Sequence, residues 1–217
     1  MVLGFSHRGK IYNLHKQSIQ TRMFHICWIP LLPAIPLNSF LVFDKATNCI
    51  VIPLNLLSLL IGYTRGLSFF VSLVSLIIYS TDNDINDLYR SIICISIFIF
   101  SYIILIPSRK QLFQRRLIGL ETGIFSQPQW LKKETQIELL SALESKWNES
   151  NKFLWQSAIK SHDCPKEKIP LLFSIAAFKK NIERNDQNSY LFNEVVKMAK
   201  ENYSFNQIKS MVKESLK

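Results

Sequence analysis

Residues 91–107 read SIICISIFIFSYIILIP, an apolar run of 17 residues without a charged side chain. As an α-helix this run is about 26 Å long, close to the hydrocarbon thickness of a bilayer. Arg90 precedes it, and four basic residues follow within nine positions of its end: Arg109, Lys110, Arg115 and Arg116. The length of the run predicts a transmembrane helix over residues 88–107. The side chains of all five cations can reach the headgroups at its two ends, and the basic cluster after it is expected on the cytoplasmic side.

A second apolar run, residues 54–80, precedes this helix and is interrupted by Asn55, Thr64 and Arg65. A charged side chain deep in a bilayer costs about 2.5 to 3.5 kcal/mol on insertion scales. We therefore predict that Arg65 lies at the inner membrane interface, where its long side chain can reach lipid phosphate. Tyr63 beside it is expected to be a headgroup anchor.

The segment that joins the two runs, residues 81–87, reads TDNDIND and has three acids and no base. Nothing in it holds it in the cytoplasm, so the sequence predicts a two-helix hairpin with both termini cytoplasmic. The alternative is that the runs are buried strands of a soluble protein, since residues 92–99 are rich in β-branched side chains. Both alternating faces are apolar, however, and a strand of 17 residues would be about three times the usual length.

Composition agrees with a membrane protein. Hydrophobic residues make up 48% of 217 positions, although the net charge is +10. Residues 1–110 have nine basic and four acidic residues and residues 111–217 have 17 and 12, so each part carries +5 and neither resembles a nucleic-acid-binding arm. The four cysteines (Cys27, Cys49, Cys94, Cys164) form no CxxC pair. We expect no disulfide framework, no metal site and no cofactor.

The N-terminal part, residues 1–53, is predicted to be a small β-rich module. Its apolar residues occur in short clusters, and the turn-like segment 44–48 separates two clusters that can pair as a hairpin. Pro30, Pro33 and Pro36 exclude a helix between them and favour an extended connection lying on the bilayer. The apolar piece at residues 1–5 is too short for a signal peptide, so none is expected.

Three segments of this module carry a resemblance: residues 5–10 (FSHRGK), 22–33 (RMFHICWIPLLP) and 36–42 (PLNSFLV). Together they resemble the N-terminal module of uncharacterised bacterial two-span membrane proteins, which is a degenerate form of a small zinc ribbon. In the zinc-ribbon versions, cysteine pairs flank the middle strand, whereas residues 16–19 (KQSI) stand here where the first pair belongs. The resemblance implies a fold element and a bacterial inner membrane, but no activity and no bound metal.

Residues 111–217 are predicted to form a cytoplasmic helical bundle. Residues 111–124 can continue the second membrane helix, and four or five short amphipathic helices follow. Ser126 and Ser204 each begin a sequence typical of a capping box. We expect residues 126–217 to be the surface for a protein partner.

No pattern of a known catalytic site is visible. His162, Asp163 and Cys164 are adjacent, which invites a Cys-His nucleophile, but neighbouring side chains point apart, and Asp163 as a helix N-cap is the preferred interpretation. We therefore predict a non-enzymatic, membrane-anchored interaction or scaffold protein. The alternative is a small membrane enzyme, or a subunit of a transporter or secretion complex, which would need ionisable groups inside the spans.

Overall fold

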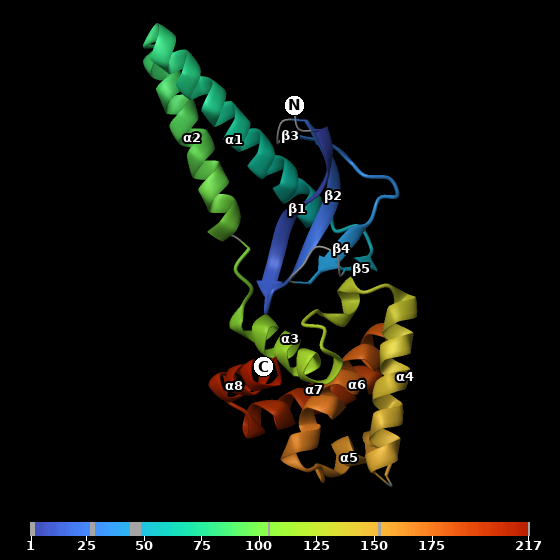
Figure 1. Ribbon diagram of the computed structural model, residues 1–217. Coiled ribbons are helices and arrows are strands. Elements are labelled where there is room, and N and C mark those ends of the chain that lie inside the picture. Colours follow the sequence, from blue (N-terminus) through green and yellow to red (C-terminus); the bar gives the residue numbers. More distant parts are fainter. Residues whose placement is uncertain (1–2, 27–28, 44–48, 104, 152, 217) are drawn as a thin grey trace. The chain divides into compact units, whose positions relative to one another are not determined.

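The computed structural model describes residues 3–26, 29–43, 49–103, 105–151 and 153–216 (Figure 1). The chain is mostly helical, with an antiparallel sheet at its N-terminal end. It divides into two compact units, Met1–Pro107 and Ser108–Lys217. The sequence predicted three parts with a boundary after Lys110. The sheet and the apolar hairpin instead form one unit, which ends three residues earlier.

The sheet of the first unit has five strands: β1 (Leu3–Leu14), β2 (Gln17–Ile26), β3 (Ile29–Pro33), β4 (Ser39–Val42) and β5 (Cys49–Ile52). The long strand β2 is central. It pairs with β1 along one edge, and on its other edge it pairs first with β4 and then with β3, all antiparallel. The predicted hairpin of β4 and β5 is confirmed, while its turn at residues 44–48 lies outside the described residues.

Two long apolar helices follow the sheet, α1 (Leu56–Asp82) and α2 (Ile85–Ile103), and they pack as the predicted hairpin (Figure 1). Their bounds differ from the predicted 54–80 and 88–107. Asn83 adopts a left-handed φ of 54° and its N–H bonds to the carbonyl of Tyr79, which ends α1. Asn and Asp tolerate this conformation better than most residues. The acidic loop is therefore reduced to two residues.

Several serines of the hairpin are buried, whereas most of its large apolar side chains are exposed. Ser72 and Ser91 are buried between the helices, with their hydroxyl oxygens 3.0 Å apart, and Ser68, Ser75 and Ser101 are also buried. Exposed side chains include Leu67, Phe69, Phe70, Val71, Leu73, Leu76 and Ile77 on α1 and Ile92, Ile93, Ile95, Ile97, Ile99, Phe100 and Ile103 on α2. A helix pair in water has the opposite polarity.

One face of α1 is built from small residues at intervals of four, namely Ser58, Gly62 and Gly66, and the sheet packs on this face. The Ser58 hydroxyl donates to the carbonyl of Gly9 on β1 (2.9 Å). A Cβ on Gly62 would lie 2.6 Å from Met23, and one on Gly66 would lie 2.2 Å from Pro30. The missing side chains thus allow β1, β2 and β3 to approach the helix closely, which explains why sheet and hairpin form one unit.

The second unit is a helical bundle made of α3 (Arg109–Thr122), α4 (Lys133–Ser150), α5 (Trp155–Ser161), α6 (Ile169–Ile182), α7 (Asp186–Asn202) and α8 (Phe205–Ser215), with short 3-10 turns η1 (Pro128–Trp130) and η2 (Lys166–Lys168). Helix α6 is central and is buried at every position of residues 169–178. It packs against α3, α4 and α7, while α8 packs on α3. A helix that is apolar all round is expected at such a position.

Helix α3 is a separate helix and not the predicted continuation of the second membrane helix. Ser108 and Gln111 form a capping box that starts it: each side chain accepts a hydrogen bond from the other residue's backbone N–H. The predicted capping box at Ser204 is confirmed, with Gln207 as its partner. The one predicted at Ser126 is wrong. A 3-10 turn begins there instead, with Pro128 at its first position and no side-chain cap.

Candidate functional site

Arg65 joins three elements of the first unit. Its Nε and Nη2 donate to the hydroxyl and the carbonyl of Ser101 on α2, both at 3.0 Å, and its Nη1 donates to the carbonyl of Lys10 on β1 (2.9 Å). The guanidinium also lies over the ring of Tyr102, with its Cζ 3.7 Å from the ring centroid. Tyr63, predicted beside it as an anchor, donates its hydroxyl to the carbonyl of Leu31. Three hydrogen bonds and one ring contact therefore fix the position of the Arg65 side chain.

The other predicted interface cations lie in different surroundings. Arg90 is exposed and forms an ion pair of 2.6 Å with the shielded carboxylate of Asp87, one helical turn before it. Arg109 and Lys110 are exposed at the start of α3. These three side chains are open to solvent on at least one side, as a headgroup contact would need.

Arg115 and Arg116 were predicted at the headgroups, but the structure buries both inside the helical unit. Arg115 is fully buried, and its Nε donates to the carbonyl of Phe125 (2.8 Å), with the ring of Trp130 5.1 Å from its Cζ. The guanidinium of Arg116 lies over the ring of Phe205 at 4.5 Å. A buried guanidinium has no surface to offer a lipid phosphate, so these two residues are part of the bundle core.

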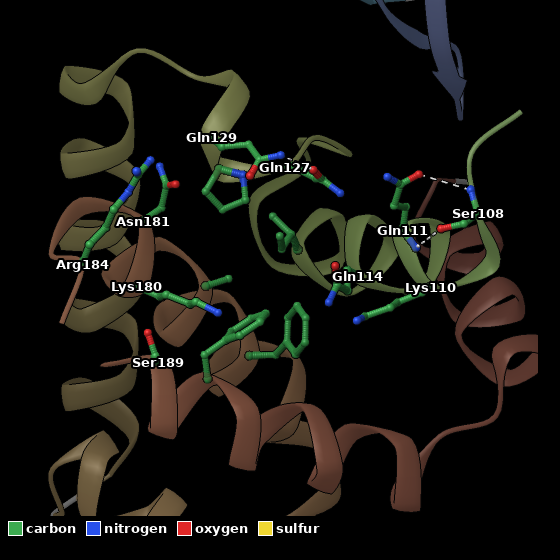
Figure 2. A pocket seen from close by; sticks show the side chains of 15 residues that line it. Ser108, Lys110, Gln111, Gln114, Gln127, Gln129, Lys180, Asn181, Arg184 and Ser189 are labelled. Carbon is green, nitrogen blue, oxygen red and sulfur yellow. Dashed lines mark hydrogen bonds between the residues drawn. The ribbon is translucent and has the colours of Figure 1, made fainter. Parts of the chain in front are cut away.

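The helical unit contains a pocket of about 630 Å³ between α3, α6 and the loop before α4 (Figure 2). Phe173, Phe192, Ile118 and Ala177 supply apolar surface. The polar lining consists of amides, cations and two serine hydroxyls: Ser108, Lys110, Gln111, Gln114, Gln127, Gln129, Lys180, Asn181, Arg184 and Ser189. The sequence did not predict this site. Its wall on α3 also lies outside the predicted docking range of residues 126–217.

The cations of this pocket are placed to act on one ligand. Figure 2 shows Lys110 on α3 and Lys180 on α6 pointing toward one another across the hollow, with Gln114 between them. The ammonium of Lys180 lies 4.6 Å from the ring centroid of Phe192, which favours an extended position for the side chain. No carboxylate is found among the described residues that line the pocket. Charge and shape therefore suit an acidic group attached to an apolar one.

The adjacent residues His162, Asp163 and Cys164 do not form a nucleophilic site. His162 ends α5 in a left-handed conformation and faces Glu194 at 3.6 Å, whereas the Cys164 thiol bonds to the carbonyl of Pro165. Burial raises the pKa of Cys164 to about 11 despite the opposing effect of Lys168. The thiol is protonated at neutral pH and lacks the thiolate that nucleophilic attack requires. The expected N-cap at Asp163 is absent too, since η2 has no side-chain cap.

Within the described part of the chain, no group of three His, Cys, Asp or Glu side chains could hold a metal ion. Two helices, α1 and α2, are long and apolar enough to cross a membrane by length and composition. Comparison of the chain with protein-family models, with curated proteins and with solved structures finds no match.

Proposed function

We propose that this chain is a membrane-anchored interaction protein whose helical unit docks a protein partner. The observation that carries the proposal is the polarity of the hairpin, with serines buried between α1 and α2 and large apolar side chains exposed along both. Small residues at the contact and apolar residues outside are typical of helices that pair in lipid. In water the exposed surface would be a large apolar patch, which soluble monomers avoid.

Charge supports one orientation of this hairpin. The loop at the tip is acidic, whereas Arg109 and Lys110 follow shortly after α2. Under the positive-inside rule both ends of the hairpin, and with them the helical unit, lie in the cytoplasm. With the resemblance noted above, the proposed location is the inner membrane of a bacterium, with both termini cytoplasmic.

The docking site we propose is the pocket between α3 and α6, and its occupant is an acidic segment of a partner protein. Lys110, Lys180 and Arg184 can pair with carboxylates, while the phenylalanine surface can accept an apolar side chain beside them. Glutamine and asparagine amides at the rim can bond to the backbone of an extended segment. An apolar floor beside cationic side chains suits the recognition of an acidic peptide segment.

The alternative of a membrane enzyme or a transporter or secretion-complex subunit has less support. It calls for ionisable groups inside the spans. Residues 67–80 and 91–103 contain no Asp, Glu, Lys, Arg or His. Arg65 is the remaining candidate for such a group. It donates hydrogen bonds to two backbone carbonyls and a hydroxyl, which gives it a structural role.

Cysteine labelling of intact cells tests the topology. In a variant whose native cysteines are replaced by serine, Asn86→Cys at the hairpin tip should react with a membrane-impermeant maleimide. Lys160→Cys, which is exposed on α5, should react only after the cells are opened. Cys164 itself is a poor inner reporter because its raised pKa slows the reaction wherever it lies. Labelling of Lys160→Cys alone from outside would overturn the orientation.

Photo-crosslinking in cells tests the docking site. A photo-reactive amino acid at Gln114, inside the pocket, should yield a specific protein adduct, and the same group at Glu138, exposed on α4, should not. Reversing both facing charges with Lys110→Glu and Lys180→Glu should reduce the adduct by tenfold or more. Each lost contact is worth about 1 kcal/mol and repulsion adds to it.

The matched control is Lys110→Arg with Lys180→Arg, which keeps the charge and should keep most of the adduct. The captured protein should contain an acidic segment at the crosslinked position. An adduct that survives charge reversal unchanged, or that forms equally at Glu138, would mean that the pocket does not select an acidic partner.

A further inference from the structure

One end of the sheet in the first unit extends along α1 toward the charge-free part of that helix, residues 67–80 (Figure 1). A Cβ on Gly62 would meet Met23 of β2, and one on Gly66 would meet Pro30, whose register partner lies two residues after Met23. Two steps along β2 therefore advance the sheet by one turn of α1, about 6 Å. The strand segments that reach this level form the sheet end: residues 4–6, 23–26 and 29–33.

The sheet end carries a row of apolar side chains on the face turned away from α1. Phe5, Phe24 and Leu32 are register partners on β1, β2 and β3, and they are called the apolar row below. Because side chains alternate along a strand, Phe24 points to the opposite face from Met23, which is fully buried beside α1. The ring centroids of Phe5 and Phe24 lie 5.3 Å apart, yet Phe5 is exposed to 55% and Leu32 to 66%. The first unit therefore leaves most of this row uncovered.

The loop after β3 enlarges the uncovered surface. Ile35 is exposed to 92%, and Leu37 is exposed as well. Residues 23–43 contain no Asp, Glu, Lys or Arg. From the sequence, only the connection over residues 30–36 was expected on the bilayer, whereas the structure adds side chains of β1 and β2 to the same surface. Contiguous exposed apolar side chains of this kind mark a site of interaction with a membrane or a protein.

An arginine lies where the apolar row ends. Arg22 is exposed two residues before Phe24, and its Cζ lies 5.1 Å from the centroid of the Phe5 ring. None of the described ion pairs includes it. The N–H of Ala34 donates to the Arg22 carbonyl (2.8 Å), which places the exposed loop at the level of this cation. An apolar surface bordered by an arginine whose side chain lies along an aromatic ring suits the boundary between acyl chains and headgroups.

Contacts with the hairpin indicate how deep the sheet end can lie. Arg65 bonds to Ser101 in the last turn of α2, where the charge-free span ends, and Tyr63 bonds to the carbonyl of Leu31 on β3. Strand β3 is thus level with the end of the span. Strand β1 is at the edge of the described sheet, so deep immersion would leave backbone groups without partners. A depth of about 5 to 10 Å, as for other interfacial segments, avoids this cost.

We propose that the sheet end inserts into the bilayer beside the hairpin, with the apolar row at the boundary between headgroups and acyl chains and Arg22 at the phosphates. The inference rests on the proposed membrane anchoring. It goes further because it assigns a third membrane contact to a sheet that the two helices alone would leave in water. Lipid is the occupant, since the surface adjoins α1 at Gly66, where the exposed apolar side chains of that helix begin, and is bordered by an unpaired cation.

Fluorescence quenching of the full-length protein in lipid vesicles tests this contact. In the variant whose native cysteines are replaced by serine, Leu32→Cys, Ile93→Cys and Asn13→Cys are each labelled with a nitrobenzoxadiazole dye. Ile93 is exposed on the hairpin, and Asn13 is exposed toward the opposite end of β1. The vesicles contain phosphatidylglycerol, phosphatidylcholine and a lipid with a nitroxide on its acyl chain. The dye at Leu32 should emit at a shorter wavelength than the dye at Asn13 and be quenched about twofold or more, since it lies among the acyl chains.

The three positions separate this inference from the anchoring on which it rests. Quenching at Ile93 without quenching at Leu32 would overturn the insertion of the sheet end and leave the anchoring in place. Absence of quenching at both positions would contradict the anchoring itself. A short emission wavelength at Leu32 without quenching would mean that protein, such as a second copy of this chain, covers the apolar row, and would also overturn the proposal.

The role of Arg22 has its own matched pair of variants. Arg22→Glu should reduce the quenching at Leu32 about twofold, because a carboxylate is repelled by lipid phosphate, whereas Arg22→Lys keeps the charge and should keep the quenching. Equal quenching in the two variants would contradict the placement of Arg22 at the headgroups.

Discussion

Gly9→Ala is expected to lower the free energy of unfolding of the first unit by about 2 to 4 kcal/mol, a large effect for the addition of one methyl group. A Cβ at this position would lie 1.8 Å from the carbonyl oxygen of Ser58, which is backbone and cannot rotate away. The φ of 65° adds the cost of a left-handed conformation, about 1 kcal/mol for alanine, to the overpacking cost of about 1 to 3 kcal/mol. The sheet must therefore move off α1 or the strand must unfold.

Unfolding of the full-length protein in detergent micelles, titrated with SDS, would measure this loss. Gly123→Ala is the matched control, because Gly123 also has a left-handed φ (69°) but has nothing within 4 Å of the added methyl group. That variant should lose only about 1 kcal/mol. Equal losses in the two variants would show that the close approach of β1 to α1 contributes nothing to stability.

The hairpin was predictable because its signal is local. Two long runs without charge and an acidic loop between them require no knowledge of the rest of the chain. The sheet's attachment to α1 was not predicted, although its signal was available. Ser58, Gly62 and Gly66 recur at intervals of four, the spacing that lets another backbone approach a helix. Within an apolar run, however, the sequence alone does not distinguish small residues that form a contact face from small residues that face lipid.

The basic cluster after the hairpin shows where counting charges along a sequence fails. Arg109, Lys110, Arg115 and Arg116 look equivalent in one dimension, yet the first two are exposed and the last two are buried. What separates them is the turn at Gly123, which brings Phe125 back onto α3 beside Arg115. The burial of a charge by a partner ten residues away depends on the path of the loop, which no periodicity reveals.

The pocket of the helical unit and the surroundings of Arg65 both depend on residues that are distant in the sequence. Lys110 and Lys180 line one pocket because α3 packs on α6. The carbonyl of Lys10 accepts a hydrogen bond from Arg65 because β1 packs on α1. The sequence singles out Arg65 as a charge that needs an explanation. Its bonds to Ser101 and Lys10 required the structure, since hydroxyl and carbonyl partners leave no pattern in the sequence.

Arg115→Ala is expected to destabilise the helical unit by about 3 kcal/mol or more. The fully buried side chain donates to the carbonyl of Phe125 at 2.8 Å, and a hydrogen bond from a charged group contributes about 1.5 to 3 kcal/mol. Truncation also leaves a cavity beside Trp130. Arg115→Lys should lie between wild type and alanine, because an ammonium cannot reproduce the planar donor geometry of guanidinium.

Urea unfolding of the full-length protein in detergent, followed by tryptophan fluorescence, would measure these losses, since Trp130, Trp147 and Trp155 all lie in the helical unit. Arg109→Ala removes the same charge from an exposed position at the start of α3 and should change stability by no more than about 0.5 kcal/mol. If Arg115→Ala proved as stable as Arg109→Ala, the turn after α3 would not need the Arg115 bond. A large difference between them would instead mark Arg115 as the residue that fastens this turn to the bundle, and would separate it from the headgroup cations with which the sequence grouped it.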